Sequence, residues 1–279
     1  MNLKSIIRKI FTIPLFEHMA ANIQRPKPFN SFWTKIIPPN SYYDKSTFRD
    51  TIIDGIRFKL FLNEWMEYIL YFGIDADNKQ HLYSHIKTGM NVIDVGTNFG
   101  ETLLHFASLS KTGTVIGFEP VPYIFEKCKS NIALNNFDNI ILENLALSDS
   151  AEELIFNDPQ NNNSGGVFLS RGSGTNKVNA ITLDNYIDSK MITKVDLIKI
   201  DVEGFEMQVI KGAINTLKKL RPLLIIELID TNLSKQNTSS TEIIALLKTL
   251  GYNKVTDLKT GMVLPDNTSS LNMDAVFSV

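Results

Sequence analysis

The chain lacks the features that mark several protein classes. Its single cysteine, Cys128, allows neither an internal disulfide nor a thiolate metal cluster. No stretch reaches the roughly 18 uninterrupted apolar residues of a membrane-spanning helix. An excess of one charge is also missing, since 28 basic and 30 acidic residues give a net charge of −2. We therefore expect no transmembrane segment and no nucleic-acid partner, and the near-absence of cysteine predicts a cytoplasmic protein.

The composition that remains is typical of a folded protein. Of 279 residues, 43% are hydrophobic and 21% are charged. At roughly 100–200 residues per domain, this length predicts one large domain, alone or with an extension. We expect residues 1–50 to form the extension, with a helix followed by a proline-rich connector at 22–50, and residues 51–279 to form the main domain.

The start of the chain has the pattern of a helix with one apolar side. We expect this helix to pack on its own domain or on a second subunit, which would make a homodimer. A basic amphipathic helix can also lie on an anionic membrane surface, so peripheral membrane contact is the alternative. The apolar residues at helical spacing are Leu3, Ile6, Ile7 and Ile10.

From residue 91 onward, short apolar runs alternate with helical patterns, which predicts a parallel sheet covered by helices on both faces. One segment, about 151–185, breaks the alternation and is predicted to be an inserted hairpin around a polar loop. Two further hairpins are expected, one over residues 51–62 with an Asp54-Gly55 turn and one that closes the sheet at the end of the chain. The predicted sheet strands are 91–95, 114–118, 140–142, 195–200, 223–228, 252–257 and 275–279, and the predicted helices between them are 101–109, 123–134, 205–217 and 241–250.

A glycine-containing turn follows the first of these strands and leads directly into a helix. Ligands of open parallel sheets bind beyond the carboxyl ends of the strands, so this turn is the first candidate site. A dinucleotide fingerprint requires G-x-G-x-x-G, but here Asn98 replaces the second glycine and the last spacing is one residue short. The turn also begins with an acid, Asp94, which suits a cationic ligand such as S-adenosylmethionine better than a pyrophosphate.

Carboxylates follow two further strands. Glu119, after the second strand, can accept hydrogen bonds from a ribose diol, and Ser148 and Asp149, after the third, could contact an adenine edge. After the fourth strand, Asp201 and Glu203 are close in sequence, which predicts a cofactor or substrate role. The alternative for these two acids is helix capping. Glu206 is expected on the solvated face of the following helix.

Together these segments resemble the FkbM-type methyltransferases, which depend on S-adenosylmethionine. The similarity covers about residues 50–230, and several spaced motifs agree in order. The matching text is EYILYFG (67–73), VIDVGTNFG (92–100), GFEP (117–120), ALSD (146–149), ITLDNYI (181–187), DLIKIDVEGFE (196–206), KGA (211–213) and LLIIEL (223–228).

The resemblance implies an α/β fold of the class I methyltransferase (Rossmann-like) type, a three-layer sandwich with a seven-stranded, mostly parallel sheet and, here, an N-terminal helical extension. It implies O-methylation of a hydroxyl on a sugar, glycan or other small-molecule acceptor. Carried over by position, Asp94, Gly96, Asn98 and Gly100 would hold the methionine part, Glu119 the ribose, Ser148 and Asp149 the adenine, while Asp201 would lie near the methyl-transfer point. Asp201 and Glu203 are the candidate bases.

Several alternatives stay open at this stage. The domain could be a catalytically inactive binding or scaffold module, and N- or C-methylation would use the same cofactor half of the site. The histidines do not predict a metal site, because His81 and His85 have no evident third ligand. His105 is expected to be packed or solvated. A Mg²⁺ ion held by Asp201, Glu203 and Glu227 remains an unproven alternative.

Overall fold

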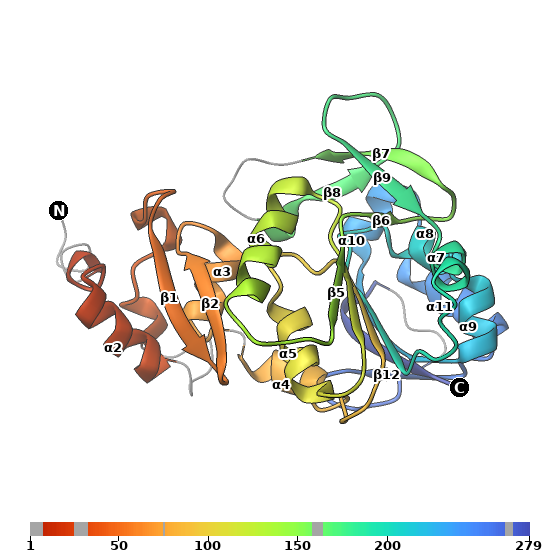
Figure 1. The fold of residues 1–279 in the computed structure, drawn as a ribbon, viewed down its shortest axis with the longest axis horizontal. Helices are drawn as coiled ribbons and strands as arrows, with labels where there is room; N and C mark the ends of the chain where they lie inside the picture. The colour runs from red at the N-terminus through yellow and green to blue at the C-terminus, as the bar shows by residue number, and fades with distance from the viewer. Residues whose placement is uncertain (1–7, 25–32, 75, 158–163, 266–269) are drawn as a thin grey trace. The chain divides into compact units, whose positions relative to one another are not determined.

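A computed structural model describes residues 8–24, 33–74, 76–157, 164–265 and 270–279. These residues form two compact units (Figure 1). One unit takes the chain up to residue 81 together with residues 160–165, and the other takes the remainder. The division into an extension over 1–50 and a domain over 51–279 stays a prediction.

The first unit contains a helix, α2 (Pro14–Gln24), and a β-hairpin of β1 (Phe48–Ile53) and β2 (Ile56–Phe61). The predicted turn is confirmed, since Asp54 and Gly55 both have positive φ, 51° and 81°, as the tight turns of two-residue hairpins require. Of the helix predicted at the start of the chain, residues 1–7 lie outside the described residues and 8–10 are helical. The other elements of this segment are the 3₁₀ turns Trp33–Lys35 and Asn40–Tyr42 and the helices α3 (Trp65–Phe72) and α4 (Ala76–Tyr83).

The second unit is built on a sheet whose described strands run in the order β12-β13-β11-β10-β3-β4-β5. Every neighbouring pair is parallel except the two pairs made by β13, which is antiparallel to both β11 and β12. Seven strands in this order, with one antiparallel strand near the edge, form the class I methyltransferase sheet, so the predicted fold class is confirmed. The strands are β3 (Val92–Val95), β4 (Val115–Phe118), β5 (Ile140–Glu143), β10 (Leu197–Ile200), β11 (Leu223–Ile229), β12 (Lys254–Asp257) and β13 (Asn272–Ser278).

Helices cover both faces of this sheet (Figure 1). Successive strand residues point to opposite faces, and in the inner strands both faces are buried, as continuous apolar runs predict. Val92 packs with residues of α5 (Glu101–Ser110), whereas its neighbour Ile93 packs with the opposite layer. The remaining covering helices are α6 (Pro122–Ala133), α7 (Leu183–Ser189), α8 (Glu206–Lys211), α9 (Ile214–Leu220), α10 (Asp230–Leu233) and α11 (Ser240–Thr249).

The strand order reverses at β3. From β3 the chain proceeds to β4 and β5 on one side, and then returns to β10 on the other side of β3. In an open parallel sheet, ligands bind at such a switch point, beyond the carboxyl ends of the strands. The turn after β3 therefore lies where a ligand site is expected.

A smaller sheet of order β6-β9-β7-β8 follows the carboxyl end of β5. It contains the predicted inserted hairpin as β7 (Glu152–Asn157) and β9 (Lys177–Ile181), which pair antiparallel. The sequence did not predict β6 (Ala146–Leu147), β8 (Phe168–Ser170) or α7. The residue before α7, Thr182, caps this helix, because its side chain accepts a hydrogen bond from the amide of Asn185. Part of the predicted polar loop, 158–163, lies outside the described residues.

One predicted helix, over residues 205–217, is two helices in the structure. α8 ends at Lys211 and α9 begins at Ile214. The break lies at Gly212, where a Cβ atom would come within 1.9 Å of the carbonyl oxygen of Ser148. The close approach of Ser148 thus leaves no room for a side chain at the break, a contact that local periodicity does not reveal.

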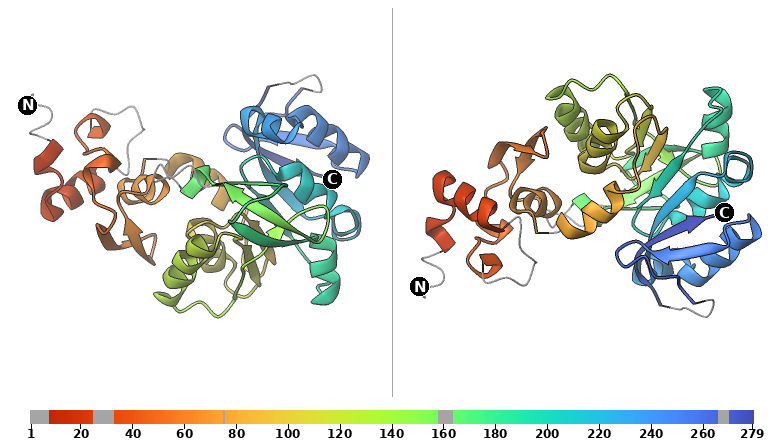
Figure 2. Two further views of the ribbon diagram at one scale, coloured as in Figure 1. Left: turned by 90° about the horizontal axis from the view of Figure 1, so that it is seen from above. Right: turned by 90° about the horizontal axis from the view of Figure 1, so that it is seen from below.

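The last strands, β12 and β13, pair antiparallel as predicted and lie beside α11 (Figure 2). None of the helices in the described part of the chain combines the length and the apolar character needed to cross a bilayer.

Candidate functional site

Asp94, the third residue of β3, lies fully buried among the carboxyl ends of the central strands. Its Oδ2 accepts a hydrogen bond from the Thr102 hydroxyl at 2.6 Å, so the first turn of α5 holds the carboxylate. Its Oδ1 accepts no hydrogen bond from the described residues, and the ammonium of Lys199 lies 3.5 Å away. A buried carboxylate oxygen of this kind can still accept a bond from a ligand.

The turn after β3 needs its glycines for steric reasons. Gly96 has φ of 84°, and a Cβ atom there would lie 1.8 Å from the carbonyl oxygen of Asp201. Asn98 also has positive φ, 52°, and Gly100 has φ of 97° with the Cys128 sulfur 2.9 Å from its hypothetical Cβ. The backbone of this turn thus packs closely against Asp201, at the end of β10, and against Cys128 of α6. This packing fixes the position at which α5 begins.

Glu119, directly after β4, organises the same turn. Its Oε2 accepts the backbone N–H of Asn98 at 2.9 Å, and its Oε1 accepts that of Val121, also at 2.9 Å. Burial raises the pKa of Glu119 to about 7, although these two hydrogen bonds act in the opposite direction. Because each carboxylate oxygen can accept two bonds, both retain capacity for the hydroxyls of a ribose.

Lys199 is a site residue that the sequence reasoning missed. It is buried in β10, with Nζ 3.0 Å from Asp201 Oδ2 and 3.5 Å from Asp94 Oδ1. Burial alone would lower the pKa of Lys199, but the charges of Asp201 and Asp94 outweigh it and raise this pKa above the ordinary range. The ammonium therefore links two acids from neighbouring strands. In the sequence, the one sign of a buried charge here was a single lysine within the otherwise apolar strand LIKI.

Three acids lie close together, two just after β10 and the third within β11. Carboxylate oxygens of Asp201, Glu203 and Glu227 lie within 4.8 Å of one another. Hard oxygen ligands at this separation could hold a divalent cation such as Mg²⁺, although acidic groups also gather without one. The structure thus brings together the two predicted catalytic acids and Glu227, the same three acids that the sequence analysis named as the alternative Mg²⁺ site.

Two acids of this group, Glu203 and Glu227, have raised pKa values. Burial, followed by the charges of Asp201 and Glu206, raises the pKa of Glu203 to about 8. Burial and the neighbouring acids also raise the pKa of Glu227 strongly. Glu203 has positive φ, 55°, and its Oε2 accepts a hydrogen bond of 2.7 Å from the Asn232 side chain. This carboxyl is therefore held in place and can exchange a proton close to neutral pH.

Glu206 was expected on the solvated face of a helix, and that expectation is wrong. It is 1% exposed, and its Oε1 accepts the backbone N–H groups of Val202 and Gly204 at 3.1 and 3.2 Å. The side chain folds back to bind the start of its own helix and the turn before it. The turn packs inside the protein, so Glu206 is buried although its position in the sequence suggested the solvent-exposed face of the helix.

Ser148 and Asp149, the predicted adenine neighbours, lie in an ionic network. Ser148 is buried and its hydroxyl donates to Glu152 Oε1 at 2.8 Å. Arg171, which follows β8, pairs with both Asp149 and Glu152. The guanidinium of Arg171 lowers the pKa of Glu152 to about 2. The inserted sheet therefore fixes the segment after β6, a link that no sequence motif indicated.

His105 is packed, as one of the two expectations had it. It is 5% exposed, its ring stacks on Tyr83 with centroids 4.4 Å apart, and its Nδ1 lies 2.8 Å from the Glu101 carbonyl oxygen. These contacts place His105 in the packing around α5 rather than at the strand ends.

The residues at the switch point suit S-adenosylmethionine. A buried acid with a spare oxygen can face a cationic ligand, a tight turn brings backbone close to the site, and Glu119 offers acceptors for a diol. The individual roles of Asp94, Gly96, Asn98, Gly100, Glu119, Ser148, Asp149 and Asp201 in binding stay predictions.

Comparison with known proteins identifies the family. The family model described as "Methyltransferase FkbM domain" matches residues 94–254, more than half of the chain. The hexuronic acid methyltransferase AglP of Haloferax volcanii is 29% identical over 132 residues, 47% of this chain and 53% of the relative. The 2-O-methyltransferase NoeI of Sinorhizobium fredii is 29% identical over 148 residues, 47% of this chain and 60% of the relative. The chain thus spans only about half to three fifths of these two relatives.

Solved structures with similar folds are more distant. Methyltransferase FkbM from Methylobacillus flagellatus has 16% identity and a TM-score of 0.45, covering 76% of this chain and 53% of its own. A TehB-like methyltransferase from Corynebacterium glutamicum has 11% identity and a TM-score of 0.47, covering 76% and 93%. The family match over residues 94–254 begins within β3 and includes the turn at the switch point and the strands β4, β5, β10 and β11 of the central sheet. The chain belongs to the FkbM methyltransferase domain family, as its sequence motifs predict.

Proposed function

We propose that the protein is an S-adenosylmethionine-dependent methyltransferase that O-methylates a hydroxyl of a sugar or other small-molecule or glycan acceptor. The observation that carries the proposal is the glycine turn at the switch point, with buried carboxylates at the ends of the strands around it. Membership of the FkbM family supports the same cofactor.

Bound S-adenosylmethionine supplies a methyl group on a positively charged sulfur, which is already an activated leaving group. In our proposal, Asp94 and the turn 96–100 hold the methionine part, Glu119 accepts the ribose hydroxyls, and Ser148 and Asp149 border the adenine. Much of the rate enhancement then comes from positioning the acceptor oxygen in line with the methyl carbon.

The acceptor hydroxyl must lose a proton as its oxygen attacks, and Glu203 is our choice for the general base. Its pKa of about 8 lies close to neutral pH, where a general base works best. Asp201, the second candidate, accepts a hydrogen bond of 3.0 Å from the Lys199 ammonium through its Oδ2, so this oxygen is already engaged. Asp201 then serves to position Lys199 and the turn of Gly96.

The acceptor class rests on the relatives. The names of AglP and NoeI describe a hexuronic acid methyltransferase and a 2-O-methyltransferase. A sugar hydroxyl is therefore the first acceptor to test. The acids at the strand ends favour acceptors whose hydroxyl groups donate hydrogen bonds to carboxylates. A homodimer and a cytoplasmic location stay predictions of the sequence.

Cofactor binding is tested by isothermal titration of the purified protein with S-adenosylhomocysteine, with NAD as the control ligand. We expect micromolar binding of S-adenosylhomocysteine and none of NAD. Glu119→Gln should weaken binding at least about tenfold, since one strong hydrogen bond to a charged group contributes about 1.5–3 kcal/mol. The control Asp188→Asn, an exposed acid on α7, should bind as the wild type does.

Catalysis is tested with radiolabelled S-adenosylmethionine and a panel of neutral and acidic sugars. Transfer that Glu203→Gln reduces at least about a hundredfold, with S-adenosylhomocysteine binding intact, would support the proposed base. Cofactor binding without transfer to any acceptor would favour the inactive module. A folded protein that does not bind S-adenosylhomocysteine would refute the methyltransferase proposal.

A further inference from the structure

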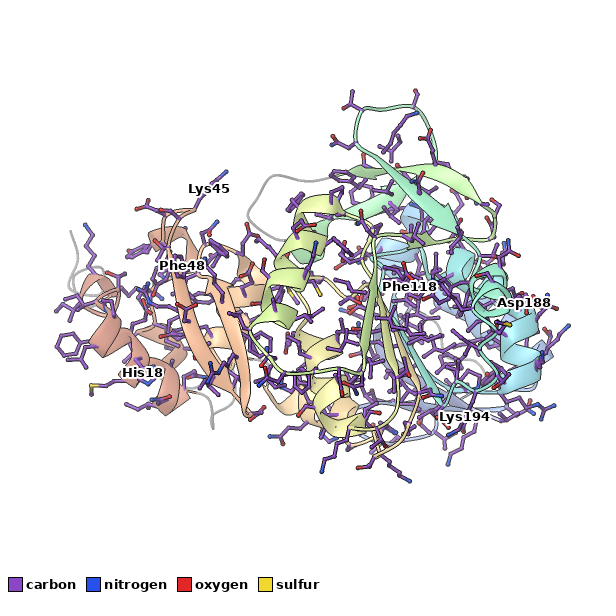
Figure 3. The ribbon with its side chains drawn as sticks, in the orientation of Figure 1. His18, Lys45, Phe48, Phe118, Asp188 and Lys194 are labelled. Atoms are coloured by element: carbon purple, nitrogen blue, oxygen red, sulfur yellow. The ribbon has the colours of Figure 1, made fainter. Side chains whose placement is uncertain are left out.

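Helix α2 turns its large apolar side chains to solvent. Leu15, Phe16 and Met19 lie on one side of the helix, and two apolar residues before it are exposed as well. Figure 3 labels His18 on this helix and shows side chains that project from it on the side turned away from β1. The exposed fractions are 44% for Ile10, 49% for Ile13, 69% for Leu15, 39% for Phe16 and 51% for Met19.

The opposite side of α2 is the buried one, and it holds two polar residues and two alanines but no large apolar side chain. Glu17, Ala20, Ala21 and Gln24 are buried there. Glu17 makes two hydrogen bonds with Arg49 on β1, at 2.7 and 3.1 Å, and its side chain is fully buried. A helix of a folded protein ordinarily buries its apolar side. Here the Glu17–Arg49 pair fixes the reverse orientation, because rotating the helix would break this buried pair.

Basic residues accompany these exposed apolar side chains. Lys9 and His18 are exposed and Arg8 is partly exposed, with its Nε donating to the Lys35 carbonyl oxygen. Within residues 8–24, Glu17 is the only acid, and it is buried and paired. The surface formed by residues 8–19 therefore combines apolar side chains with basic ones and exposes no carboxylate.

We propose that this surface, which we call the α2 face, docks onto an anionic lipid bilayer. Basic residues attract anionic headgroups, and apolar side chains of an interfacial helix enter the boundary between headgroups and acyl chains. A symmetric dimer through the same face would bring the basic residues of two copies together, and such like-charge contact opposes it. Charge complementarity thus selects the bilayer over a second copy.

The test uses the full chain and vesicle co-sedimentation. Vesicles of phosphatidylcholine alone are compared with vesicles that also contain phosphatidylglycerol. We expect binding to the mixed vesicles, weakened by added salt. Replacing Leu15, Phe16 and Met19 together by serine should reduce partitioning into the vesicles at least about a hundredfold. The variant would lose the free energy gained when these three apolar side chains move from water into the bilayer. Lys9→Ala should reduce it about fivefold.

The matched control replaces exposed apolar residues elsewhere, namely Ile52, Met191 and Met262, which are 60%, 84% and 71% exposed. This variant should partition as the wild type does, and both serine variants should keep the wild-type melting temperature. Three results would overturn the proposal. The protein could bind both kinds of vesicle equally, or it could be a dimer in solution that becomes monomeric when Leu15, Phe16 and Met19 are replaced by serine. The third such result is a melting temperature that falls in this variant but not in the control.

Discussion

Lys199→Met tests whether the ammonium between Asp94 and Asp201 holds the site together. Methionine keeps an unbranched apolar side chain, one atom shorter than that of lysine, and removes the ammonium with its charge and hydrogen-bond donors. Lys199 is 6% exposed, and its partners lie 3.0 and 3.5 Å away. Removing one member of a buried ion pair costs about 3–5 kcal/mol, because the remaining charges stay buried without compensation.

The protein offers a matched control near the start of the same strand. Lys194 is 3.0 Å from Asp196, but its side chain is 61% exposed. Lys194→Met should therefore change the free energy of unfolding by only about 0–1 kcal/mol, the range measured for exposed pairs. The two variants remove the same group at the same distance from an aspartate, so burial is the main difference.

The assay is urea unfolding followed by circular dichroism at pH 7, on both variants and on Lys199→Met/Asp201→Asn. The double variant should recover part of the loss, since it removes one of the uncompensated carboxylates. A loss for Lys199→Met no larger than that for Lys194→Met would refute the idea that this ion pair supports the site.

Four further predictions concern three residues of the same site. Thr102→Val keeps the side-chain shape but removes the donor to buried Asp94, so urea unfolding should show a loss of about 1–3 kcal/mol. Gly96→Ala should abolish S-adenosylhomocysteine binding in titration, because the new Cβ would meet the Asp201 carbonyl oxygen at 1.8 Å, and normal binding would contradict the geometry. Glu203 has its pKa raised to about 8, so its folded form binds protons more tightly than its unfolded form. Its contribution to stability is therefore present at low pH and is lost as pH rises from about 4.5 through about 8, a slope that Glu203→Gln should flatten in unfolding measured across this range. If Glu203 is the base, the rate at low acceptor concentration should rise over the same pH range and level off above pH 8, and a rate independent of pH would contradict that role.

Much of the fold could be predicted from the sequence because the spacing of apolar residues along the chain indicates strands and helices directly. Buried parallel strands need continuous apolar runs, whereas the helices between them need apolar residues at helical spacing. The succession of strands and helices along the chain was therefore predictable. The Asp54-Gly55 turn was readable too, since few residues adopt positive φ easily. The break at Gly212 was not, and the carbonyl oxygen of Ser148 that packs against this glycine comes from a distant part of the chain.

The candidate site divides in the same way. The sequence by itself determined which acids and glycines follow the strands, since a strand end and the next helix are neighbours along the chain. Only the tertiary structure decided which of them meet: Lys199 between Asp94 and Asp201, and Glu227 beside Glu203. It also decided that Glu206 is buried and that α2 exposes its apolar side. Burial and charge contacts between strands depend on packing in three dimensions, whereas a sequence pattern reports only the preferences of neighbouring residues.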